Sequence, residues 1–189
     1  MTLAGAPRVL FYVQHLLGIG HLKRAATLAR AMEAEGLAVT IVSGGKEVPG
    51  LDIGGSAFVQ LAPMRSQDEH FRVMLDDDDR PVDDAIRAAR RSDLLATVTQ
   101  LRPHIVLTEL FPFGRRHLRG EIIPMIEAAR SQSPAAAIVS SVRDILVEPS
   151  KKERGPEMVE MVQRYFDLVL IHGDPALVPF ERTFPLAGA

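Results

Sequence analysis

The sequence has no cysteine, and its net charge is only −2, from 22 basic and 24 acidic residues. The absence of cysteine excludes disulfide bonds, thiolate catalysis and zinc–thiolate sites, and it is consistent with a reducing compartment. A charge balance this even provides no global field that would favour nucleic acid or an anionic membrane. We therefore expect no nucleic-acid partner.

Long hydrophobic runs are also missing. Residues 1–8 lack the apolar core of a signal peptide, and the apolar stretch over residues 9–17 is interrupted by Gln14 and His15. That stretch is too short to span a bilayer, so we expect no transmembrane segment. The sequence favours a cytoplasmic protein, which could still be peripheral at the membrane. Residues 184–189 contain no helix stop, charged tail or closing strand, and we interpret them as the point where a longer chain is interrupted.

Short β-branched runs alternate with longer segments of helical period, which indicates βαβ units and a parallel sheet. We expect six strands, at residues 8–13, 38–42, 57–61, 104–108, 136–140 and 167–171. The predicted fold class is α/β, a doubly wound Rossmann-like parallel sheet in a single domain over residues 1–189. Right-handed crossovers favour the strand order 3-2-1-4-5-6.

Segments of helical period lie between these strands. One helix follows the glycine turn at residues 18–20, a second covers residues 82–101, and a later one carries apolar positions from 158 to 166. The helix between the fourth and fifth strands contains Pro124, so it either begins near Gly120 or kinks at the proline. The polar, acidic residues 64–79 are expected to form an irregular excursion.

Ligands of an open parallel sheet bind outside the carboxyl ends of the strands, where the strand order reverses. In the predicted order that point lies between the first and fourth strands, so His21 and Glu109 are expected to face one crevice. A histidine can take the proton of an attacking hydroxyl, while a carboxylate behind it fixes the tautomer and stabilises the imidazolium. The structural alternative is that His21 only caps or packs at a helix start.

The loop after the first strand is rich in glycine but is not a dinucleotide fingerprint, because Lys23 stands where the third glycine would be. A P-loop is absent as well. Gly18 and Gly20 would let the backbone approach a ligand closely and leave the helix N-terminus open to anions. Arg24 could contact a phosphate of the acceptor, or it could be an ordinary solvated residue of the first helical turn.

Two further groups follow the predicted strand ends. After the fifth strand, Ser141, Arg143 and Asp144 could hydrogen-bond an acceptor, or the arginine and aspartate could form a local pair. After the fourth strand, Phe113 and Arg116 belong to a basic–aromatic patch that could bind an anionic lipid or phosphate, or form a wall of the acceptor site. The other members of this patch are Phe111, Arg115, His117 and Arg119. His172, after the sixth strand, could face the cleft, although a turn at the edge of the domain explains it adequately.

Two charged clusters are interpreted as solvent-exposed. The acidic run at residues 76–79 resembles a metal-binding motif, but it lies in a polar loop before a helix rather than at a strand end. Arg87, Arg90 and Arg91 are expected to form a basic, solvent-facing helix surface. No metal or other cofactor is expected.

Several motifs together resemble a known family. They are VLFYV at residues 9–13, GIGHLKR at 18–24, TELFPFGRR at 108–116 and SVRDI at 141–145. These segments are similar to those of predicted GT-B glycosyltransferases related to the peptidoglycan GlcNAc transferase, a family 28-like group. The resemblance implies an N-terminal, acceptor-binding Rossmann-like domain, with His21 as the base. It also implies a C-terminal domain for the nucleotide-sugar donor, which this chain does not contain.

The resemblance therefore implies a glycosyltransferase whose fragment alone is inactive, with the missing C-terminal domain as partner and a glycosyl acceptor that could be lipid- or phosphate-linked. Two alternatives stay open. A GT-B-fold nucleotide-sugar epimerase uses the same architecture but needs carboxylates in both domains. A non-catalytic α/β ligand-binding or regulatory domain would be indifferent to His21→Ala.

Overall fold

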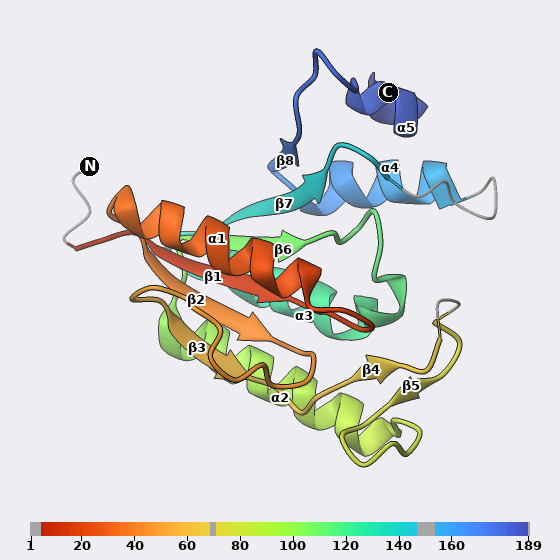
Figure 1. Ribbon diagram of the computed structural model, residues 1–189. Coiled ribbons are helices and arrows are strands. Elements are labelled where there is room, and N and C mark those ends of the chain that lie inside the picture. Colours follow the sequence, from red (N-terminus) through yellow and green to blue (C-terminus); the bar gives the residue numbers. More distant parts are fainter. Residues whose placement is uncertain (1–4, 69–70, 147–153, 189) are drawn as a thin grey trace.

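A six-stranded parallel sheet organises the fold in the computed structural model, which describes residues 5–68, 71–146 and 154–188 (Figure 1). The strand order is β3-β2-β1-β6-β7-β8, so the predicted order is confirmed. Each predicted strand has a counterpart, and β7 continues to Arg143 instead of ending at Ser140. The strands are β1 (Arg8–Val13), β2 (Ala38–Ser43), β3 (Ala57–Gln60), β6 (Ile105–Glu109), β7 (Ala137–Arg143) and β8 (Leu168–His172).

Helices cover both faces of the sheet. The helix α1 (Gly20–Ala34) lies on one face, and α2 (Asp84–Leu101) and α3 (Arg119–Arg130) lie on the other (Figure 1). Successive residues of a strand point to opposite faces, and β1 obeys this rule. Its Val9, Phe11 and Val13 pack with α1, whereas Leu10 and Tyr12 pack with α2 and α3. Because both faces are covered, β1 is hydrophobic throughout, as expected of a central parallel strand.

The predicted helix boundaries agree closely with those observed. Asp83 caps α2, since its side chain accepts a hydrogen bond from the backbone N–H of Ile86 at 2.8 Å. A short 3₁₀ turn, η1 (Arg116–Leu118), leads into α3, which begins at Arg119 and holds Pro124 in its second turn. The alternative in which this helix starts near Gly120 is therefore the observed one. A further helix, α4 (Arg154–Tyr165), precedes β8.

The acidic excursion is more ordered than predicted. It contains a two-stranded antiparallel pair, β4 (Arg65–Ser66) and β5 (Met74–Leu75), followed by the tight turn of the aspartate run. In that turn the Asp76 carboxylate accepts hydrogen bonds from two backbone N–H groups, and Asp77 lies 3.1 Å from the ammonium of Lys46. These carboxylates therefore bind neighbouring groups of the chain. Among the described residues no group of three or more His, Asp or Glu side chains is arranged to hold a metal ion.

The C-terminal segment folds back onto the loop that follows β6. It comprises α5 (Phe180–Thr183) and a 3₁₀ turn, η2 (Pro185–Gly188). Phe180 and Phe184 are buried there together with Val142. Within the described ranges, no helix has the length and apolarity needed to cross a membrane.

Candidate active site

The structure brings His21 and Glu109 together at the carboxyl edge of the sheet. Glu109 is the last residue of β6, and His21 is the second residue of α1, directly after the loop that leaves β1. Because β1 and β6 are neighbours in the sheet, the two side chains meet, with Nδ1 of His21 2.8 Å from Oε2 of Glu109. The structure therefore brings the two predicted residues into direct contact, and the crevice that they would face stays a prediction.

Arg24 completes this cluster. Its Nη2 donates to Oε1 of Glu109 at 2.6 Å, and the same nitrogen lies 3.4 Å from Nδ1 of His21. The Glu109 side chain is fully buried, whereas those of His21 and Arg24 are each 26% exposed. A buried carboxylate is stable only beside such partners. Arg24, predicted to contact an acceptor phosphate, is thus also the ion-pair partner of the buried acid.

The two carboxylate oxygens of Glu109 differ in their hydrogen bonding. Oε1 accepts an aligned hydrogen bond from Arg24, but the contact of Oε2 with His21 is close without having hydrogen-bond angles. Since Nδ1 is the ring nitrogen near the carboxylate, Nε2 is the one left for a substrate. Apart from the missing hydrogen-bond angles, this is the placement in which a carboxylate orients a histidine base.

The turn after β6 fixes the position of Glu109. Leu110, the next residue, has a φ of 67°, a left-handed conformation that is strained for a leucine. The turn is held in place by buried hydroxyls: the carbonyl of Phe111 accepts hydrogen bonds from Thr108 Oγ1 at 2.9 Å and from Ser140 Oγ at 2.8 Å. Strained backbone persists only when its surroundings determine it, and such sites are enriched in functional residues.

Gly18 and Gly20 lie beside the His21 backbone and leave open space. Both are exposed, and a Cβ added at either one would meet no atom within 4 Å. Neither has a positive φ, so the fold itself does not require glycine at these positions. The helix α1 starts here without a side-chain cap, because Ile19 occupies the N-cap position. The N-terminus of α1 thus has no side-chain cap, and anion binding there stays a prediction.

His172 extends the cluster on the other side. Ser141 lies next to Glu109 across the β6–β7 ladder, and its Oγ is 2.8 Å from Nε2 of His172, the last residue of β8. Burial lowers the pKa of His172, the positive charge of Arg24 lowers it further, and the negative charge of Glu109 raises it. His172 therefore lies within electrostatic range of the centre. The sequence places His172 at the carboxyl end of a strand but favours a turn residue, whereas the structure joins it to Ser141 beside Glu109.

Two residues predicted to contact the acceptor, Phe113 and Arg116, contact other parts of this chain. The ring of Phe113 packs edge-on against Phe180 and Phe184, with centroids 5.8 and 5.3 Å apart. Arg116 is exposed and forms an ion pair of 3.3 Å with Glu157 of α4. Phe113 thus belongs to an aromatic cluster with the C-terminal segment, Arg116 is paired with an acid at the surface, and binding roles for both stay predictions.

Arg143 and Asp144 also differ from each other. Arg143 is exposed at the end of β7, and no ion pair joins these two residues, both of which the structure describes, so the predicted local pair is not formed. Asp144 is half-buried, and its carboxylate lies so close to Gly173 that any side chain at position 173 would overlap it. The roles of Arg143 and Asp144 in acceptor binding likewise stay predictions.

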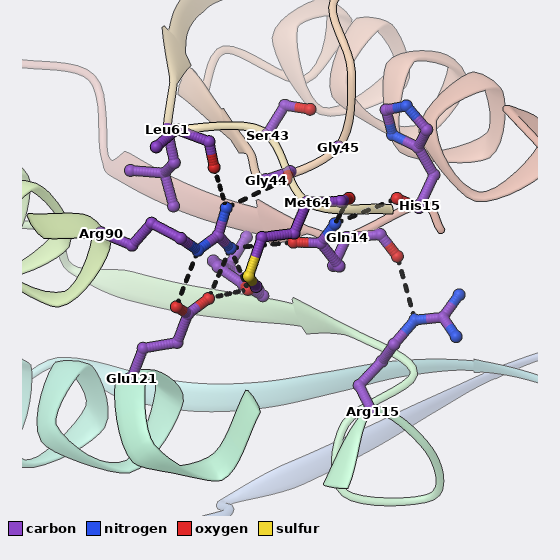
Figure 2. Close-up of polar contacts among 12 residues, drawn as sticks. Gln14, His15, Ser43, Gly44, Gly45, Leu61, Met64, Arg90, Arg115 and Glu121 are labelled. Atoms are coloured by element: carbon purple, nitrogen blue, oxygen red, sulfur yellow. Dashed lines mark hydrogen bonds and ion pairs between the residues drawn. The ribbon is translucent and has the colours of Figure 1, made fainter. Parts of the chain in front are cut away.

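A second cluster, the Arg90 network, lies under the ends of β1 and β2 (Figure 2). The prediction that Arg90 is exposed with Arg87 and Arg91 is wrong: Arg90 is fully buried, while Arg87 is half-buried and Arg91 exposed. The physical reason is Glu121 of α3, a buried carboxylate that needs a cation. The guanidinium of Arg90 donates to both oxygens of Glu121 at 3.0 and 2.7 Å, to Gln14 Oε1 at 2.9 Å, and to the carbonyls of Gly44, at 3.0 Å, and Ala62.

Gln14 connects this network to the loops of the site. Its side-chain amide donates to the carbonyls of His15 and Met64, at 3.0 and 2.9 Å. The backbone carbonyl of Gln14 accepts a hydrogen bond from Nε of Arg115 at 3.0 Å (Figure 2). This bond connects the loop after β6 to the end of β1. Sequence reasoning missed both Gln14 and Arg90. Gln14 directly follows a buried strand, which is the signal that could have identified it.

Gly44 and Gly45 allow the closest approaches in this region. A Cβ at Gly44 would overlap the carboxamide of Gln14 and the guanidinium of Arg90, and a Cβ at Gly45 would overlap the ring of His15. His15 is itself buried, which lowers its pKa; a hydrogen bond with the backbone of Lys46 raises that pKa, and the positive charge of Arg115 lowers it further. The glycine pair is therefore required by packing, in contrast to Gly18 and Gly20.

The fold recurs in solved glycosyltransferases. No protein-family model matches the chain, and a search of curated proteins finds no match. Among solved structures the chain is similar to the glycosyltransferase SsfS6 of Streptomyces sp. SF2575, with a TM-score of 0.55, 15% identity, and coverage of 92% of this chain and 52% of that one. It is also similar to UGT2 of Phytolacca americana complexed with UDP-2-fluoro-glucose and pterostilbene, with a TM-score of 0.55, 10% identity, and coverage of 94% and 50%.

A third similar structure is MurG of Acinetobacter baumannii, with a TM-score of 0.50, 13% identity, and coverage of 87% of this chain and 41% of that one. Identities this low show the fold alone. The chain therefore has the Rossmann-like α/β fold found within GT-B glycosyltransferases. It spans about half the length of SsfS6 and UGT2, at 52% and 50%.

Proposed function

We propose that this chain is the acceptor-binding domain of a glycosyltransferase, which transfers a sugar from a nucleotide-sugar donor to a hydroxyl of an acceptor. The observation that carries the proposal is the 2.8 Å contact between His21 and Glu109 at the point where the strand order reverses. The similarity to glycosyltransferase structures supports it. The donor would be held by a second, C-terminal domain, which makes up the remaining half of such proteins.

In the proposed mechanism His21 acts as the general base. Nε2 accepts the proton of the acceptor hydroxyl as its oxygen bonds to the anomeric carbon of the sugar, while the bond from that carbon to the phosphate breaks and the nucleotide leaves. The negative charge of Glu109 stabilises the imidazolium that forms. Arg24 holds the buried Glu109 carboxylate in place through the 2.6 Å ion pair. General-base catalysis of this kind contributes about 10²–10⁴-fold to the rate.

The acceptor would enter over the Gly18–Gly20 loop, where the backbone leaves open space beside His21. It could be lipid- or phosphate-linked, as the resemblance implies. The proposed chemistry needs no metal and no cofactor, because a histidine base suffices to activate a hydroxyl. We further propose that the protein works in the cytoplasm.

The test uses the full-length gene product. We would measure nucleotide release from a panel of nucleotide sugars, with and without candidate acceptors, for the wild type and His21→Ala. We expect His21→Ala to lower turnover by about 10²–10⁴-fold while circular dichroism stays unchanged. Lys23→Ala is the matched control, because Lys23 is exposed two residues further along the same helix.

Unchanged turnover in His21→Ala would refute the assignment of the base. Conversion of a nucleotide sugar without any acceptor would identify an epimerase instead. A protein that binds a ligand without turnover, and does so equally well as His21→Ala, would be a binding domain.

A further inference from the structure

A cavity of about 340 Å³ lies between the N-terminal parts of α2 and α3. It shares no lining residue with the cluster of His21, Glu109 and Arg24. Its walls come from the first two turns of α2, from the η1 turn and from the start of α3. The lining residues are Asp84, Arg87, Ala88, Arg91, His117, Leu118, Gly120 and Glu121.

Two arginines of this cavity have no carboxylate partner. Arg87 and Arg91 are four residues apart, so they lie one above the other on α2. Neither guanidinium forms an ion pair or hydrogen bond with any residue that the structure describes. Glu121 also lines the cavity, but its charge is neutralised by the buried Arg90. Asp84, exposed at the start of α2, is the one remaining acid among the lining residues, so the two free arginines outnumber it.

His117 reports the electrostatic character of the cavity. Its pKa is lowered from 6.5 to about 4, first by burial and then by the positive charges of Arg115, Arg87 and Arg90, while the negative charge of Glu121 raises it in part. The ring stacks on Phe71 with centroids 6.4 Å apart, and the guanidinium of Arg115 lies 5.8 Å from the centroid of the same Phe71 ring. The wall is thus a fixed stack in a positive environment, next to the positive end of the α3 dipole.

We propose that this cavity binds the phosphate group of a phosphorylated small molecule. Arg87 and Arg91 offer planar forks of N–H donors that match phosphate oxygens, and a guanidinium is the side chain that binds such groups bidentately. Gly120 contributes space, since a Cβ there would meet no atom within 4 Å. The site does not depend on the proposed sugar transfer, and either assignment can fail without the other.

The experiment titrates the purified chain with inorganic phosphate and with glycerol 3-phosphate. The ring signals of its six histidines would be followed by NMR at neutral pH, with chloride keeping the ionic strength constant. His117→Gln identifies the signal of His117. We expect a saturable shift of that signal and, in Arg87→Gln/Arg91→Gln, binding weaker by at least about tenfold. Arg164→Gln is the matched control, because Arg164 is an exposed arginine on α4, and it should bind like the wild type.

No saturation up to about 10 mM phosphate would overturn the proposal, as would equal affinity in the double variant. Sedimentation with phosphatidylcholine vesicles containing phosphatidic acid distinguishes the source of the phosphate. Binding of glycerol 3-phosphate without vesicle binding supports a soluble ligand. Vesicle binding that the double variant loses, together with saturable phosphate binding, supports the same site occupied by a lipid headgroup.

Discussion

Replacing Arg90 by methionine should destabilise the protein more than any nearby surface substitution. Methionine fills a similar volume but removes the donors for both oxygens of Glu121, for Gln14 Oε1 and for the carbonyls of Gly44 and Ala62. Glu121 would remain as a carboxylate with 6% exposure and only the hydroxyl of Tyr12 to bind it. Breaking a buried pair in this way costs about 3–5 kcal/mol.

That loss is large beside the roughly 5–15 kcal/mol by which domains are usually stable. In a chain of this length about 1 kcal/mol corresponds to 2–4 °C, so the melting temperature should fall by roughly 6–20 °C. Urea unfolding followed by circular dichroism gives the free energy of unfolding directly. Arg91→Met is the matched control, since Arg91 is the next residue on α2 and is exposed, and it should change stability by no more than about 0.5 kcal/mol.

A second variant separates the ion pair from packing. Arg90→Met/Glu121→Leu removes both charges, and replacing a whole buried pair by apolar side chains is often neutral. The double variant should therefore recover most of the lost stability. Equal stability of Arg90→Met and Arg91→Met would refute the reasoning, because Arg90 would then contribute no more than a surface arginine.

Three further predictions follow from the same structure. Gly44→Ala should destabilise the chain in urea unfolding by about 1–3 kcal/mol, because its Cβ would overlap Gln14 and Arg90, whereas Gly20→Ala should be neutral or stabilising; similar values for both would contradict the packing argument. The free energy of unfolding should fall by up to ~3 kcal/mol as the pH decreases from 6.5 to about 4, because the folded-state pKa of His117 lies below its unfolded value and the unfolded chain takes up the proton first. His117→Gln should flatten that part of the pH profile, and an unchanged slope would contradict the assignment. The pKa of Tyr12 is shifted in the opposite direction, because burial and then Glu121 raise it. The contribution of Tyr12 to the free energy of unfolding is therefore present below pH 10 and is lost as the pH rises through the raised pKa. The decline of stability at alkaline pH should therefore be less steep in Tyr12→Phe, and equally steep curves would count against it.

The fold could be predicted because its determinants are local. Val9 to Val13 form an uninterrupted apolar run, which is typical of a strand that is covered on both faces. Segments of helical period lie between such runs, and this alternation indicates a parallel sheet. The strand order then followed from the handedness of crossovers. The meeting of His21 and Glu109 could be predicted for the same reason, since Glu109 ends β6 and His21 follows the loop that leaves the neighbouring strand β1.

The rest depended on contacts that a single sequence does not encode locally. Arg90 lies between two arginines that are not fully buried, and only its distant partner Glu121 on α3 explains its burial. Phe113 likewise follows Glu109 closely in sequence, but its position is set by Phe180 and Phe184 near the C-terminus. The burial of Arg90 and the position of Phe113 are set by tertiary packing, which overrides the local pattern of charge and hydrophobicity.

The two buried carboxylates, Glu109 and Glu121, show how a structural site differs from one that is suited to a ligand. Glu121 has hydrogen bonds on both oxygens from a fully buried arginine, so its environment is complete within the chain. Glu109 has an aligned bond on one oxygen only, and its partners His21 and Arg24 are each 26% exposed. A buried charge left partly satisfied, beside side chains that solvent can reach, is costly for stability alone. That cost is consistent with selection for a task other than folding, and the proposed base at His21 is such a task.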